Sequence, residues 1–172
     1  SQGAVFDLMR NPNVENLTLA LPTIPDTVPP VVTQVELDYG TGRITITTDE
    51  SCNIGIVTGE GLFQYKLRLS NQTVNTSYGF DHELNTPLIE IIELKDATFS
   101  GKQPAKVSSV QFVITLSEEN RIKALRMSGT VGGDTRPLFF SVEPNAFSDM
   151  VGNNNTAQVL IIDESPDTVL PI

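Results

Sequence analysis

The chain has 172 residues, 39% of them hydrophobic, which is enough for one domain with a core of its own. Its 11 basic and 21 acidic residues give a net charge of −10, and the Lys and Arg residues are scattered. This composition excludes a nucleic-acid-binding surface, which needs clustered cations. No apolar run approaches the ~20 residues of a membrane-spanning helix. Residues 1–10 lack the pattern of a signal peptide, so we expect any targeting segment to have been removed or to lie upstream.

Short strands separated by Gly, Asn, Asp and Pro dominate the sequence, which is typical of an all-β, antiparallel sandwich. Residues 31–38 and 43–48 alternate between hydrophobic and polar types around a Gly-containing turn. They predict a hairpin in which Gly40 and Gly42 adopt positive φ. Further strands are predicted at residues 53–57, 62–69, 87–94, 107–116, 138–142 and 156–163.

One segment breaks the β pattern and predicts a single short helix at residues 118–126. Ser117 precedes two glutamates, an order that favours a helix N-terminus. Ile122, Leu125 and Met127 are expected to form its apolar face. The fold expected from the sequence is therefore a β-sandwich with one helix.

No catalytic residue is predicted, and we expect the protein not to be an enzyme. His82 is the only histidine and is interpreted as a solvated residue of a polar loop. No nucleophile elbow, phosphate-binding glycine loop or His/Cys metal motif occurs. Cys52 is the only cysteine, which rules out an internal disulfide, and we expect it to be buried.

The two ends of the chain repeat each other. Residues 4–14 (AVFDLMRNPNV) align with 146–156 (AFSDMVGNNNT), and residues 24–30 (IPDTVPP) align with 165–171 (SPDTVLP). The two blocks occur in the same order at nearly the same offset, which indicates an internal repeat.

We interpret residues 26–166 as one module, residues 1–25 as a copy of its last strand, and residues 167–172 as the start of the next linker. An isolated strand cannot satisfy its own backbone. It therefore belongs either to the preceding module of a longer array or to the sheet of a neighbouring subunit. The predicted inter-module strand comprises Leu17, Thr18, Leu19, Ala20 and Leu21. The predicted junction residues are Asp26, Thr27, Val28, Pro29, Pro30, Pro166, Asp167 and Pro171.

Pro29 and Pro30 have two interpretations. Two successive prolines fix φ and favour an extended path, so they could act as a stiff spacer between modules. Alternatively, they could block unwanted pairing at a sheet edge.

The stretches DTVPPVVTQVELDYGTGRITITTDE and AFSDMVGNN resemble Ig-like repeats in large extracellular arrays of microbial and algal surface proteins. Asp149, Gly152 and Asn153 match the D-x-x-G-N turn that precedes the last strand of such repeats. Arg10 replaces the turn glycine in the N-terminal copy, so that turn is expected to differ. The resemblance implies an Ig-like sandwich in a surface-exposed or filamentous protein and specifies no ligand.

Calcium is the cofactor that the junctions suggest, because hard cations take oxygen ligands and tandem extracellular modules often bind them between modules. Ordinary turn chemistry of Asp and Asn is the alternative. Candidate ligands near the second junction are Asp149, Asn153, Asp163, Glu164 and Asp167, and those near the first are Asp7, Asn11 and Asp26.

Four Asn-x-Ser/Thr sequons, at Asn16, Asn71, Asn75 and Asn154, favour a secreted or cell-surface protein that is N-glycosylated. We expect a structural module that packs end to end with identical or homologous modules, without nucleic-acid binding or membrane insertion. The alternative is an adhesin-type domain whose polar loop, residues 70–86, binds a glycan or a protein.

Overall fold

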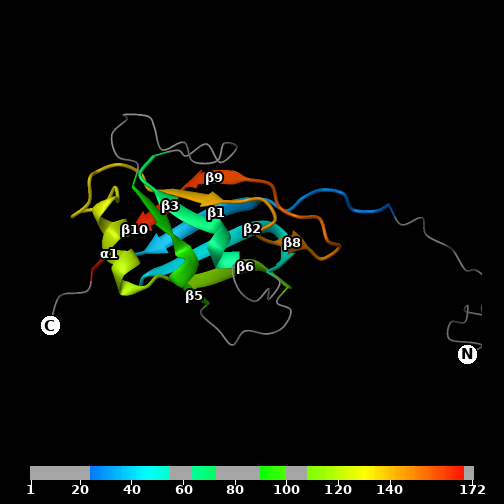
Figure 1. Cartoon of the computed structure of the whole chain (residues 1–172), viewed down its shortest axis with the longest axis horizontal. Helices are drawn as coiled ribbons and strands as arrows, with labels where there is room; N and C mark the ends of the chain where they lie inside the picture. Colours follow the sequence, from blue (N-terminus) through cyan, green and yellow to red (C-terminus); the bar gives the residue numbers. More distant parts are fainter. Residues whose placement is uncertain (1–23, 55–62, 73–89, 100–107, 169–172) are drawn as a thin grey trace, which may run out of the picture.

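In this computed structural model the described residues are 24–54, 63–72, 90–99 and 108–168 (Figure 1). They form two packed β-sheets and one short α-helix, which confirms the predicted all-β sandwich. Its Ig-like relationship stays a prediction. The first sheet has the order β10 (Asp163–Ser165), β1 (Val32–Asp38), β2 (Arg43–Asn53), β6 (Ser108–Thr115), β5 (Thr98–Phe99), with β8 (Ser148–Asp149) also paired to β2. The second has the order β4 (Ile91–Glu93), β3 (Leu67–Ser70), β7 (Phe139–Val142), β9 (Gln158–Ile161).

The predicted hairpin is present as β1 and β2, whose alternate residues are buried. Gly42 has a φ of 67°, as expected, but Gly40 does not have a positive φ. Instead, the N–H of Gly40 donates to Oδ1 of Asp38 at 2.8 Å, so an Asx turn helps to reverse the chain. Strand β2 also continues past Thr48 to Asn53.

Three predicted strands differ from the observed elements. Asn53 ends β2 rather than starting a strand, and residues 55–57 lie outside the described part of the chain. The predicted strand 62–69 begins instead with the 3-10 helix η1 (Phe63–Lys66), in which only Phe63 is buried, and the strand β3 starts at Leu67. The predicted strand 87–94 is represented by β4 and is followed by the 3-10 helix η2 (Leu94–Asp96).

The predicted last strand, 156–163, is divided between the two sheets. Strand β9 pairs antiparallel with β7, whereas β10 pairs parallel with β1 in the other sheet. Ile162 lies between them, is 3% exposed, and donates its N–H to the carbonyl of Leu138 at 2.9 Å. Burial of this single residue between the sheets accounts for the passage of the chain from one sheet to the other. The pair of β10 with β1 is parallel, whereas the other strand pairs of the described residues are antiparallel.

Helix α1 (Glu118–Arg126) has the predicted bounds, and Oγ of Ser117 accepts a hydrogen bond from the N–H of Asn120. Its buried residues differ in part from the expected ones. Ala124 and Met127 are buried, but the side chain of Ile122 is 42% exposed. The helix covers one end of the sandwich (Figure 1).

The core lies between the two sheets. The rings of Phe63, Phe112 and Phe147 pack against one another with centroids 5.9 to 6.3 Å apart. Cys52 is buried and free, as predicted. The largest fully buried side chains are Tyr39, Phe140, Leu37, Ile44, Ile46, Leu67, Leu69, Leu94, Ile114, Met127, Leu138 and Val35.

Candidate functional site

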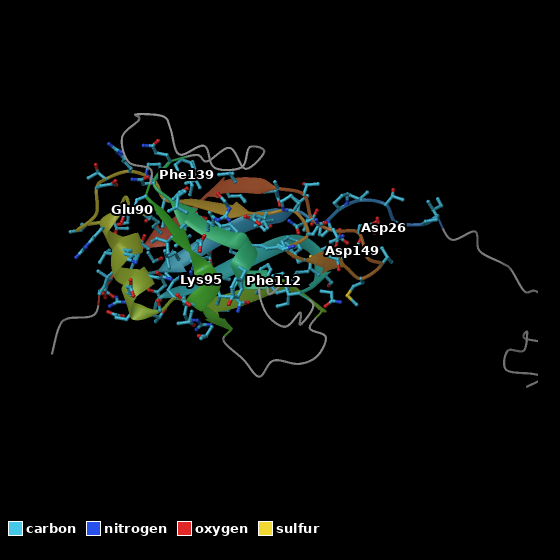
Figure 2. All side chains as sticks on the ribbon, in the orientation of Figure 1. Asp26, Glu90, Lys95, Phe112, Phe139 and Asp149 are labelled. Carbon is cyan, nitrogen blue, oxygen red and sulfur yellow. The ribbon has the colours of Figure 1, made fainter. Side chains whose placement is uncertain are left out.

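Residues 26–30 and the turn 149–153 that follows β8 form a contact that we call the N-terminal junction. Nδ2 of Asn153 donates to the backbone carbonyls of Asp26 at 3.1 Å and Val28 at 3.5 Å. Oδ1 of Asp26 accepts from the N–H of Val28 at 3.0 Å. These bonds fix the path of residues 26–28 where they meet the sandwich, and Figure 2 shows Asp26 and Asp149 at the same end.

Two of the predicted junction prolines pack on the sandwich. Pro30 is buried and Pro29 is half-buried, and both precede the first residue of β1. They therefore lie ahead of β1 rather than inside an edge strand, and their spacer role stays a prediction.

The hydrogen bonds and backbone conformation of the turn 149–153 explain its D-x-x-G-N sequence pattern. Oδ1 of Asp149 accepts from the backbone N–H groups of Val151, Gly152 and Asn153 at 2.6 to 2.9 Å. Gly152 has a φ of 104°, which favours glycine. Burial alone would raise the pKa of Asp149, but the hydrogen bonds from Asn153, Gly152 and Val151 outweigh it and lower that pKa.

Three carboxylates converge at this junction. Asp26, Glu50 and Asp149 offer oxygen atoms that lie within 4.8 Å of one another. Partial burial, followed by the charges of Asp149, Asp26 and Asp49, raises the pKa of Glu50. Carboxylate oxygens are ligands for hard cations, so these three residues are the ones in the described part of the chain that could hold Ca²⁺. Sequence analysis missed Glu50, because only the pairing of β2 with β8 brings it here.

The structure does not bring the five candidate calcium ligands near the second junction together. Asp149 and Asn153 lie at the N-terminal junction, whereas Asp163, Glu164 and Asp167 lie on or after β10 at the opposite end (Figure 1). The separation arises because β9 and β10 carry the chain from one end of the sandwich to the other.

Residues 163–168 meet helix α1 in a second contact, which we call the C-terminal junction. Nη1 of Arg121 donates to Oδ2 of Asp167 at 2.9 Å and to the carbonyl of Tyr39 at 2.7 Å. Nε and Nη2 of the same guanidinium donate to the two oxygens of Glu118 at 2.8 and 2.7 Å. The hydrogen bonds that Arg121 donates to Glu118 and Asp167 raise the pKa of Arg121. Arg121 thus attaches Asp167 to the helix, a role that the sequence did not indicate.

Glu164 is engaged inside the module. Its Oε1 accepts from the hydroxyl of Tyr39 at 2.6 Å, and its Oε2 accepts from the N–H of Gly129 at 3.0 Å. Tyr39 is fully buried, and its burial, followed by its hydrogen bond to Glu164, raises the pKa of the phenol. Glu164 therefore attaches β10 to Tyr39 and to Gly129 in the loop after α1.

Two of the four sequons fall in the described residues. Asn154 is exposed. Asn71 is half-buried, and its Oδ1 accepts from the N–H of Glu90 at 3.3 Å. The other predicted site residues lie outside the described part of the chain: Asn16, Asn75, Leu17, Thr18, Leu19, Ala20, Leu21, Asp7, Asn11, His82 and Pro171, together with most of the loop 70–86.

Comparisons with protein-family models, with curated proteins and with solved structures gave no match for this chain. In the described residues, no helix has the length and apolar character needed to cross a membrane.

Proposed function

We propose that residues 26–166 are a structural module of an extracellular filament or cell-surface tandem array, which acts by end-to-end packing and self-association. The observation that carries this proposal is the position of the two linkers. The incoming linker contacts the turn after β8 through Asn153, and the outgoing linker contacts α1 through Arg121. The two contacts lie at opposite ends of the sandwich (Figure 1), so successive modules joined through them follow one another in a line.

The pairing of the last strands supports the array version of this proposal. Strand β7 pairs with β9, and β1 pairs with β10, so the module already holds both parts of its own last segment. A copy of that segment in residues 1–25 would need the sheets of another module. A preceding module that lacks its own copy supplies such sheets, whereas in an identical subunit the places of β9 and β10 are already filled.

The extracellular part of the proposal is supported by the exposed sequon at Asn154, which lies beside the N-terminal junction, and by the acidic, Lys-poor composition. Any glycan on Asn154 would project from the end of the module that the incoming linker meets.

Deletion of residues 1–25 tests whether the module is complete. We expect the 26–172 chain to melt at nearly the temperature of the full chain, measured by circular dichroism, because every strand of the two described sheets lies within residues 26–172. A large fall in melting temperature that an added peptide of residues 1–25 restores would show that the segment belongs to this module's own sheets. A 26–172 chain that assembles as well as the full chain, measured by sedimentation, would exclude strand donation.

A further inference from the structure

Exposed apolar side chains lie at both ends of the sandwich. At the N-terminal junction, Val28, Met150 and Val151 are 60% to 68% exposed. At the other end, Ile122 on α1 is 42% exposed, and Val131 in the loop after α1 is 94% exposed. Single exposed apolar residues are ordinary, but groups of them where a linker enters and where it leaves indicate contact surfaces.

The two ends also differ in the charged side chains that they leave without an ion pair. Asp26, Glu50 and Asp149 converge at the N-terminal junction, and none of them forms an ion pair with a Lys or Arg of the described residues. The α1 end carries both signs of charge, including Glu118, Glu119 and the exposed Asp134, but its Arg126 and Arg136 are exposed and have no ion pair within the described ranges. Each end therefore presents apolar side chains next to charges that the opposite end could neutralise.

We propose that the N-terminal junction of one copy of this chain docks against the α1 end of a second copy. The proposal deepens the proposed array function and rests on it. The docking surface of the first copy comprises Asp26, Val28, Glu50, Met150 and Val151. The docking surface of the second copy comprises Ile122, Arg126, Val131 and Arg136.

The chain order supports this orientation. Asp167 leaves the module at the α1 end and aligns with Asp26 in the repeat, so the α1 end of one module faces the N-terminal junction of the next. Residues 166–172 span at most about 25 Å when fully extended, which keeps consecutive ends close. The contact joins two different surfaces, so it is heterologous and can continue from copy to copy.

Sedimentation equilibrium of the full chain, in EDTA and up to millimolar concentration, tests the docking. We expect self-association that Arg126→Glu and Arg136→Glu each weaken by about tenfold or more, because each places like charges face to face. Lys95→Glu is the matched control, since Lys95 is exposed and lies on η2, outside both surfaces (Figure 2). A circular dichroism melt checks that every variant is folded.

Reversing one charge on each docking surface provides the second part of the test. We expect Glu50→Lys to weaken self-association, and a mixture of the Glu50→Lys chain with the Arg126→Glu chain to associate better than either alone. Absence of self-association, equal weakening by Lys95→Glu, or association that appears only after Ca²⁺ is added would each overturn the docking. None of these outcomes would change where residues 26–30 and 163–168 lie in the fold. The proposed array is tested separately, by the maximum dimension of a chain that carries residues 26–166 twice.

Discussion

At the scale of single residues, three consecutive asparagines have three different roles. Asn153 donates to the incoming linker, Asn154 is exposed within its sequon, and Asn155 is 2% exposed. Oδ1 of Asn155 accepts from the N–H groups of Ala146 and Phe147 at 2.7 and 2.9 Å, and its Nδ2 donates to two backbone carbonyls. The sequence shows only a polar turn here, because the roles depend on which backbone groups the folded chain brings near.

We expect Asn155→Ala to lower the free energy of unfolding by about 3 kcal/mol, because it leaves buried backbone groups without partners. Asn154→Ala is the matched control and is expected to change it by less than about 0.5 kcal/mol. Urea denaturation of both variants measures the difference. Equal losses would contradict the assigned roles.

The raised pKa of Glu50 predicts that the stability of the fold depends on pH. Its pKa in the folded chain is raised above the ordinary value of 4.5, so the ionised form is the less favourable one in the fold. We therefore expect Glu50→Gln to raise the melting temperature at neutral pH. The gain should shrink as the pH falls through the raised pKa toward 4.5, since Glu50 itself then becomes neutral.

The melts are recorded in EDTA, so that no divalent cation offsets the repulsion among the carboxylates. Asp96→Asn, which removes an exposed carboxylate on η2, is the control for net charge. A Glu50→Gln chain that melts below the unaltered protein at neutral pH would contradict the repulsion.

At the scale of elements, the β1–β2 turn depends on one glycine. Gly42 has a φ of 67°, and a Cβ at this position would lie 3.2 Å from Cδ of Arg121. We expect Gly42→Ala to destabilise the protein by about 1–2 kcal/mol, because a left-handed backbone disfavours a side chain. Gly42→Asn should cost less, since Asn tolerates this conformation. Thermal melting of both variants measures the order, and an Asn variant no more stable than the Ala variant would contradict the backbone explanation.

Elements with a clear local signal were predictable. The alternation of β1 and β2, and the Ser-Glu-Glu start of α1, led to the observed hairpin and helix. The 3-10 helix η1 and the crossing at Ile162 were not predictable, because short apolar runs do not show which sheet a residue will face. Of the candidate site, the turn 149–153 was recognisable from its motif, but Glu50 and Arg121 were not, because long-range contacts define their roles.

At the scale of the whole molecule, the sandwich has two ends that carry different side chains, and the hydrophobic core lies between its two sheets. The backbone of Asp26 is hydrogen bonded to the turn after β8, and Asp167 is paired with Arg121 on α1. Because each linker is attached at its own end, we expect the direction of one module to determine that of the next. In the proposed array, the repeated Asp-Thr-Val at residues 26–28 and 167–169 would mark the two junctions.

The central claim is that copies of this module follow one another end to end, and small-angle X-ray scattering tests it most directly. The chain to measure carries residues 26–166 twice in succession, with everything else unchanged, and the unaltered 172-residue chain is the control. We expect the maximum dimension to increase by about the length of one sandwich, with a scattering curve typical of an elongated particle. A compact particle, in which the two copies lie side by side, would contradict the claim.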